Sequence, residues 1–442
     1  MRVRLRALQE RLRGSLFFVP MVFVVGSVIL GEAMLVLDDR VDDVPRRFTS
    51  TVDSARSVLA LVGGATMTFA GIAFSVSLLL ISLASSQYSP RVVHGLFRDP
   101  FNKRVIGVVV GTFTYCLVVM REVRGPLDDG RSATIPNLAV ALAVILGIVA
   151  ILSTVAFISH AAHTMDVSTI LHRVTDEAIG QVRATWPESR PESDGDRSDP
   201  GRDRPPDDGF VVRFDRQGWI QQIDDDALLE CLEPGACLWL DTAAGRYAIP
   251  GTPIGTLSPA PADDEAAERA QLLVRGAMII GDTRTLQQDV SYGVRQLADV
   301  ALKALSPGVN DPTTAQDAMF HLGAVLEEII RREPPPPRRV GDEGRVLVRM
   351  QALTRAEAVD LGFDEVRLAA ADQPTVLIYL LEILEQLVIS IDGRDRDDAV
   401  AALARQAELI TQTVAGSELP EPDRARVYDA YRHRFTAGPA DR

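Results

Sequence analysis

The chain has 442 residues, enough for two or three domains, and its 46 Lys and Arg against 60 Asp and Glu give a net charge of −14. Residues 1–180 carry a net charge of +3, whereas residues 181–442 carry −17. Because binding to a phosphate backbone requires basic surface, the acidic C-terminal part argues against nucleic acid as a partner. The three cysteines, Cys116, Cys231 and Cys237, form no Cys-x-x-Cys pair, which favours a reduced, cytoplasmic setting.

An apolar run from Leu16 to Leu37 follows five arginines in the first 14 residues. A signal peptide has a similar start, but this run is longer, no clean cleavage site follows it, and further apolar runs come after it. We therefore interpret it as a first transmembrane helix. Its one acidic residue, Glu32, is a candidate intramembrane functional group, because charge inside a bilayer is costly. The alternative, which we favour, is that Glu32 reaches the headgroups from near the outer end of the span.

A second and longer apolar run extends from Val58 to Ala84 without a formal charge. It exceeds the roughly 20 residues that a helix needs to cross a bilayer. Helical periodicity places small and hydroxyl side chains on one face of this span, namely Gly64, Thr68, Gly71, Ser75 and Ser82. Such a face serves either close helix packing or a polar passage, and we favour packing. A homo-oligomer would allow both.

Two further spans are predicted at residues 105–120 and 135–159, which completes a membrane domain over residues 1–165. The N-terminal tail and the segment after the second span are the most basic connections, so the excess of Lys and Arg favours both termini inside. The remainder of the chain is then cytoplasmic.

Three polar residues, His160, His163 and Asp166, follow the fourth span at intervals of three. Imidazole and carboxylate groups suit zinc, and histidine titrates near neutral pH, so a metal site or a pH sensor is one interpretation. The other, which we favour, is that these residues are interfacial polar groups at the end of a membrane helix, because residues six apart do not share a helix face.

The cytoplasmic part is predicted to be an α+β domain. Residues 166–209 comprise a helix up to Trp186 and then a disordered linker rich in Pro, Gly, Ser and charge. Residues 210–262 contain short β-like runs with turn residues between them and form a small β-rich module. Residues 263–442 are predicted to be mostly helical, with one strand near residues 345–350.

Within the helical region, we predict one amphipathic helix over residues 284–305 and a second that starts at Asp311-Pro312. Further helices are predicted around residues 354–371, 373–391, 395–416 and 421–435. The densest polar groups here are Arg284, Asp289, Asn310 and Asp311, which are candidates for contact with a ligand or another subunit. The alternative, which we favour, is a helix–loop–helix corner whose Asn and Asp side chains satisfy backbone donors.

Four motifs together resemble a known family: QYSPR after the second span, GTFTYCLVV in the third, HAAHTMDVSTIL after the fourth, and GDTRTLQQDVSYGVRQLADVALKALSPGVNDPTTA in the C-terminal half. The chain is similar in these motifs, and over nearly its whole length, to the predicted bacterial membrane proteins of domain-of-unknown-function family 2254. The resemblance implies a bacterial inner-membrane protein with a cytoplasmic C-terminal domain. It implies no activity and no catalytic residues.

No P-loop, nucleophile elbow, HExxH or dinucleotide-binding fingerprint occurs in the sequence, so we expect neither an enzyme nor a cofactor. The functional hypothesis is an oligomeric, channel- or transporter-like membrane component with a cytoplasmic regulatory domain. The alternative is a non-conducting sensor or scaffold whose acidic domain binds a partner. The expected partners are the lipid bilayer, further copies of the chain, and a small ion or a cytoplasmic protein.

Overall fold

The computed structural model describes residues 18–40, 50–87, 100–124, 135–164, 166–189, 204–391 and 396–436. The chain divides into a membrane unit, Met1–Thr169, and a C-terminal unit, Ile170–Arg442. The expected inner-boundary motif at residues 88–91 lies outside the described residues, as do residues 190–203 of the expected linker.

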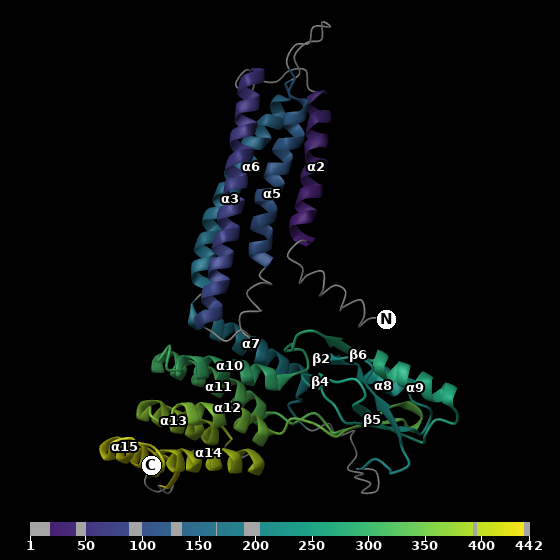
Figure 1. Ribbon diagram of the computed structural model, residues 1–442, viewed down its shortest axis with the longest axis vertical. Coiled ribbons are helices and arrows are strands. Elements are labelled where there is room, and N and C mark those ends of the chain that lie inside the picture. Colours follow the sequence, from purple (N-terminus) through teal and green to yellow (C-terminus); the bar gives the residue numbers. More distant parts are fainter. Residues whose placement is uncertain are drawn as a thin grey trace. The chain divides into compact units, whose positions relative to one another are not determined.

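Within its described residues, the membrane unit contains four helices that are long and apolar enough to cross a bilayer, as the sequence predicts (Figure 1). They are α2 (Phe18–Asp38), α3 (Val52–Gln87), α5 (Pro100–Glu122) and α6 (Asn137–Thr164). Helix α5 is the most buried and packs against each of the other three. Side chains from all four helices form the apolar clusters between them, so this bundle has its own core.

Several backbone groups at one end of the membrane unit are capped by side chains from elsewhere in the bundle. The carboxylate of Asp38, where α2 ends, accepts hydrogen bonds from the N–H groups of Leu138 and Ala139 at 2.9 and 2.8 Å. These are among the first N–H groups of α6, which have no partner within their own helix. Asp38 therefore fixes the start of α6 against the end of α2.

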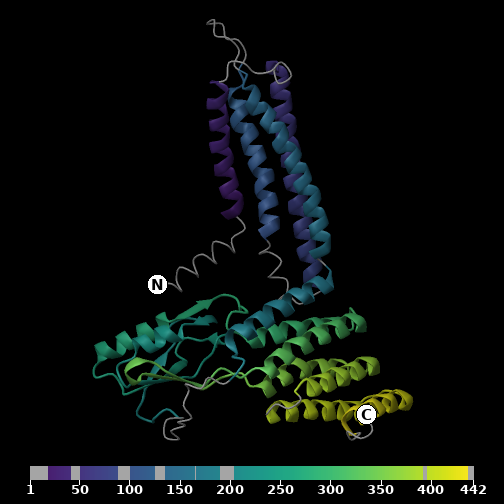
Figure 2. The ribbon, with the colours of Figure 1, turned by 180° about the vertical axis from the view of Figure 1, so that it is seen from behind.

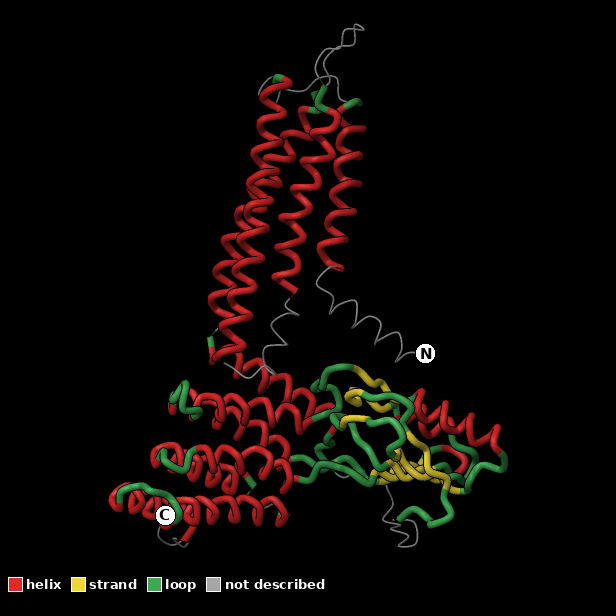
Figure 3. The backbone as a smooth tube through the Cα atoms, viewed as in Figure 1, coloured by secondary structure: helices red, strands yellow, loops and turns green. Residues whose placement is uncertain are grey.

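The C-terminal unit contains two small sheets and a helical layer, which occupy separate parts of the unit (Figure 3). The first sheet has the order β1-β5-β3-β8-β7, with the parallel pair β3–β8 among antiparallel neighbours, and the second has the order β4-β2-β6. The strand bounds are β1 Phe210–Arg213, β2 Gly218–Ile223, β3 Cys237–Leu240, β4 Tyr247–Ala248, β5 Pro253–Ser258, β6 Met278–Gly281, β7 Arg338–Val340 and β8 Val346–Arg349. Strands β6, β7 and β8 come from beyond residues 210–262, so both sheets draw on the later part of the chain.

Helices surround and extend these sheets. Helices α8 (Asp225–Cys231) and α9 (Asp264–Gly276) accompany the strands, and their apolar side chains contribute to the core of the sheets. The other helices are α7 (Val167–Thr185), α10 (Val290–Ala304), α11 (Pro312–Arg331), α12 (Arg355–Ala369), α13 (Pro374–Ser390), α14 (Asp397–Ala415) and α15 (Glu421–Tyr431). They are accompanied by the 3-10 helix η3 (Asp342–Gly344) and the π-helix η4 (Arg432–Thr436).

The helices of this layer stack in two columns, α10–α12–α14 and α11–α13–α15, which are visible from both sides of the molecule (Figures 1 and 2). The last four predicted helices are confirmed to within a few residues. Helix α11 begins as predicted, with Asp311 as its N-cap and Pro312 in its first turn.

The expected helix over residues 284–305 is wrong at its start, because α10 begins only at Val290. The preceding residues follow strand β6 as a loop of bends and a turn, which is hydrogen-bonded to residues of β2. Gln288 has a positive φ of 58°, and its side-chain amide pairs with both backbone groups of Ile223. Asp289 then caps α10 through the N–H of Tyr292. The pairing with β2 outweighs the helical periodicity of this segment.

Candidate functional site

The small-residue face of α3 lies on the outside of its own bundle. Every member of the predicted face, Gly64, Thr68, Gly71, Ser75 and Ser82, is exposed in the single chain. A Cβ atom added to Gly64 or Gly71 would meet no other heavy atom within 4 Å. The opposite face of α3, which contains Ala55, Leu59, Gly63, Thr66 and Ala73, is the one buried in the bundle.

Several glycines elsewhere in the membrane unit are in close contact with a neighbouring helix, whereas Gly26 of α2 is as open as those of the α3 face. A Cβ atom on Gly107 of α5 would lie 2.6 Å from the ring of Phe23 on α2, and one on Gly31 of α2 would lie 2.7 Å from Val118. One on Gly147 of α6 would lie 2.9 Å from Val62 of α3. Contacts within the chain therefore explain these glycines but not those on the outer face of α3.

Two more small residues, Ser57 and Ala60, extend the exposed face toward the start of α3. Large apolar side chains flank it, among them Leu61, Phe74 and Leu79, which are 73%, 61% and 64% exposed. The hydroxyl of Thr68 donates to the carbonyl oxygen of Gly64 at 3.0 Å, within the same helix. The α3 face, defined here as Ser57, Ala60, Gly64, Thr68, Gly71, Ser75 and Ser82, is thus an exposed strip of small and hydroxyl side chains flanked by large apolar ones.

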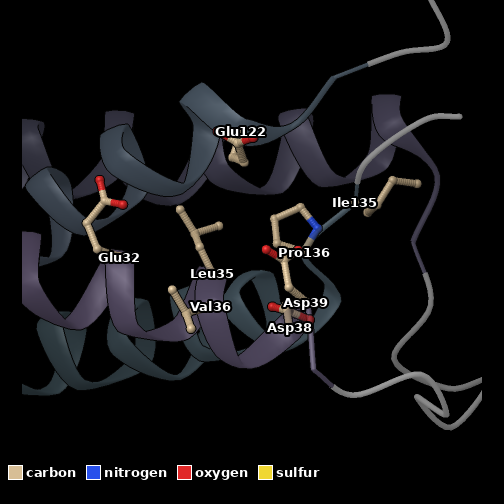
Figure 4. A pocket seen from close by; sticks show the side chains of 8 residues that line it. All are labelled: Glu32, Leu35, Val36, Asp38, Asp39, Glu122, Ile135 and Pro136. Atoms are coloured by element: carbon tan, nitrogen blue, oxygen red, sulfur yellow. The ribbon is translucent and has the colours of Figure 1, made fainter. Parts of the chain in front are cut away.

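Glu32 forms an ion pair with Arg121 of α5, at 2.8 Å between Oε1 and Nη2, and both side chains are at least half exposed. The pair lies beside a cavity of about 230 Å³ where α2 and α5 end and α6 begins (Figure 4). Its lining residues are Glu32, Leu35, Val36, Asp38, Asp39, Glu122, Ile135 and Pro136. Glu32 and Asp38 already have partners in the bundle, so these two carboxylates have structural roles.

The histidine-containing segment after α6 is described only in part. The ring of His160 lies against the ring of Phe101, with centroids 4.6 Å apart. Asp166 accepts a hydrogen bond from the N–H of Ser168 near the start of α7. The side chain of His163 lies outside the described residues. Among the described residues, no group of three or more His, Cys, Asp or Glu side chains is arranged to hold a metal ion.

Arg284 and Asp289 bind each other. The Nε of Arg284 lies 2.6 Å from Oδ2 of Asp289, and its Nη2 donates to the hydroxyl of Ser291 at 2.8 Å. The guanidinium also lies over two aromatic rings, 5.0 Å from the centroid of Tyr292 and 5.7 Å from that of Trp219. Asp289 is only 3% exposed, so the pair is an internal connection between the 282–289 loop, β2 and α10.

Asn310 and Asp311 lie at the other end of α10, some 20 Å away at 1.5 Å per helical residue. Asn310 has a positive φ of 49° in the turn between α10 and α11. Asp311 accepts hydrogen bonds from the hydroxyl and the N–H of Thr314, which lower the pKa of its carboxyl group. The four predicted contact residues therefore do not form one site.

A pair of histidines that the sequence analysis did not connect lies between α7 and α11. The rings of His172 and His321 meet edge to face, with centroids 4.7 Å apart. The hydroxyl of Thr175 lies 2.9 Å from Nδ1 of His321. His321 is hard to recognise in the sequence, because it stands alone on an amphipathic helix, 149 residues after His172.

Comparisons with known proteins identify related sequences without an assigned activity. The family model described as predicted membrane protein, DUF2254, matches residues 13–386. Uncharacterised proteins of Mycobacterium bovis and Mycobacterium tuberculosis are 30% identical to the chain over 436 residues, covering 97% of this chain and 81% of theirs. No solved structure matches the chain.

Proposed function

The chain belongs to domain-of-unknown-function family 2254, and we propose that it acts as an oligomeric, channel- or transporter-like membrane component with a regulatory C-terminal unit. The observation that carries this proposal is the α3 face, whose small and hydroxyl side chains point away from the chain's own bundle. Lipid tails gain little from such a face, whereas a closely approaching helix gains van der Waals contact along it.

A second copy of α3 is the partner we propose for this face. Its small residues would let the two backbones approach at Gly64 and Gly71, where a Cβ atom has open space. In a larger ring, the hydroxyls of Thr68, Ser75 and Ser82 would instead face a central passage. The same helix face supports both arrangements, and the bundle keeps its own core in each.

For the topology, we propose the bacterial inner membrane with both termini in the cytoplasm. The support is the concentration of Arg and Lys in the N-terminal tail and after the second span. Reporter fusions at Arg442 test this orientation: activity of a cytoplasmic reporter is expected, and activity of an external reporter would contradict it.

The conduction proposal is tested by ion flux through protein reconstituted in liposomes. Gly71→Leu and Ser75→Leu are each expected to reduce ion flux at least tenfold. The leucine side chain would obstruct either the close approach of a second α3 helix or the passage itself. Gly26→Leu is the matched control, since Gly26 is also exposed on a membrane helix with nothing within 4 Å of an added Cβ atom. Equal ion flux in the wild type and the three variants would refute a role for the α3 face in conduction.

Oligomerisation has a separate test. Ser75→Cys is expected to form a cross-linked dimer under mild oxidation, whereas Leu152→Cys on α6, which is 63% exposed, is not. Cross-linking without flux of any tested ion would favour the second candidate, a non-conducting sensor or scaffold. The hydrogen bond of Thr68 to its own helix is compatible with that candidate, because it already uses the one proton that this hydroxyl can donate.

A further inference from the structure

The histidine pair between α7 and α11 lies where the first helix of the C-terminal unit is held by the helical layer. His172 is exposed on α7, whereas His321 on α11 is partly buried. Their rings are in edge-to-face contact, and Thr175, which is only 6% exposed, bonds to His321 from the same helix as His172. The contact therefore depends on the charge state of the imidazole of His321, a group whose ordinary pKa lies near neutral pH.

The charges around His321 favour its neutral form. Burial lowers its pKa most, and the neighbouring His172 lowers it further. Asp317 on α11 and Asp176 on α7 act in the opposite direction but do not reverse the shift. Among the described residues, α10, α12 and α13, which also pack against α11, add no charge that acts on this ring.

A second contact holds α7 to α11 farther along both helices. Arg183 forms a bidentate pair with Glu328, at 3.1 and 3.0 Å. Arg183 lies eleven residues after His172, which corresponds to roughly 16 Å along α7. A carboxylate of ordinary pKa ionises well below neutral pH, and Arg183 and Arg332 lower the pKa of Glu328 further. This contact therefore remains intact over the range in which histidines titrate.

We propose that His172 and His321 form a proton-responsive contact between α7 and α11, which adds to the buried apolar contacts of the first half of α7, is intact when the ring of His321 is neutral and is weakened on acidification. Because Arg183 stays bound to Glu328, the second half of α7 remains docked. Only two residues, Met165 and Asp166, separate α7 from α6 along the chain.

The direction follows from the lowered pKa of His321. When the contact opens, the ring regains its ordinary pKa of about 6.5 and takes up a proton more readily than in the closed contact. The contact is thus fully stable above about pH 6.5 and is weakened as the pH falls below that value. For a single proton, the opening equilibrium increases about tenfold per pH unit until the pKa of the closed state is reached.

Hydrogen–deuterium exchange of the full chain in lipid nanodiscs tests the proposal between pH 7.5 and 5.0, with labelling times scaled to the intrinsic exchange rate. Peptides covering residues 170–178 are expected to lose protection about tenfold per pH unit below about pH 6.5. Peptides around Arg183 are expected to stay protected. His433→Gln, an exposed histidine on η4, is the control and should behave as the wild type.

Three variants give results that a merely structural contact would not. His321→Gln should make protection of residues 170–178 independent of pH. His172→Gln should move the midpoint to higher pH, because a neighbour that lowers the pKa of His321 is lost. Asp317→Asn should move it to lower pH. If His321→Gln does not fold, the opposite shifts of the other two variants decide the question.

The proposal is overturned if wild-type protection does not change with pH, or if His172→Gln and Asp317→Asn shift the midpoint in the same direction. It is also overturned if a chelator removes the pH response, since a metal ion rather than a proton would then control the pair. None of these outcomes depends on flux, so the proposal can fail or hold independently of the proposed conduction.

Discussion

Substitution of Gly245 by alanine should break the connection between the 282–289 loop and the sheets. Gly245 lies in the turn before β4 with a positive φ of 84°, and a Cβ atom there would overlap Oδ2 of Asp289. Asp289 is buried, caps α10 and pairs with Arg284. The side chain of Asp289 cannot move without losing these bonds, so the added methyl group acts on the network and not only on the turn.

The expected destabilisation has two parts. Alanine in the left-handed region costs about 1–2 kcal/mol. Displacing Asp289 adds about 1 kcal/mol for the lost N-cap and about 1–2 kcal/mol for the lost pair with Arg284, whose side chain is 25% exposed. We therefore expect a total loss of about 3–5 kcal/mol. Gly235→Ala is the matched control, because Gly235 has a φ of 75° with nothing within 4 Å, so only the backbone cost of about 1–2 kcal/mol applies.

Urea unfolding followed by tryptophan fluorescence measures this difference within the C-terminal unit. All three tryptophans, Trp186, Trp219 and Trp239, lie in that unit, so the signal reports on it alone. Trp219 also lies beside the guanidinium of Arg284. If Gly245→Ala and Gly235→Ala are destabilised equally, the overlap with Asp289 has no energetic consequence and the reasoning is wrong.

Two further predictions concern buried contacts, each with a matched control. Arg355→Met should destabilise the C-terminal unit by about 3–5 kcal/mol in the same assay, because Arg355 is 7% exposed, binds the carbonyl oxygen after α11 and pairs with Glu333. Arg405→Met removes a half-exposed pair with Asp360 and should lower the free energy of unfolding by less than about 1 kcal/mol. An equal loss in the two variants would contradict the stabilising role of Arg355. Gly107→Ala should lower the thermal stability of the membrane unit by about 1–3 kcal/mol through a clash with an aromatic ring of α2, whereas Gly26→Ala should not; equal melting temperatures in detergent would contradict it.

The four membrane helices could be predicted from the sequence because bilayer thickness and backbone hydrogen bonding restrict what an apolar segment can form. Their ends could not. Helix α3 starts at Val52, before the uncharged run that begins at Val58, and its Arg56 donates to the carbonyl oxygen of Val123, the residue after α5. Such a partner comes from another segment of the chain, and hydropathy carries no information about it.

The start of α10 and the position of strand β6 could not be predicted from the sequence for a related reason. Leu286, Val290 and Val294 follow a helical period, and only tertiary pairing shows that the helix begins at Val290. Strand β6 has just four residues, and its register against β2 is irregular. Local patterns predict a segment well when they agree with its tertiary contacts, and here the pairing of Gln288 with β2 opposes the local pattern.

The α3 face shows what a sequence can and cannot say about a candidate membrane site. Periodicity places Gly64, Thr68, Gly71 and Ser75 on one face, but it cannot say which face the bundle buries. That choice depends on the other helices, because α5 and α6 pack against the side of α3 that contains Ala55, Leu59 and Ala73. Small residues such as Gly107 and Gly147 complete the contacts within the chain. The glycines of the α3 face have no such neighbour in the described part of the bundle, so contacts within the chain do not explain them, and a second copy of α3 is the partner that we propose for this face.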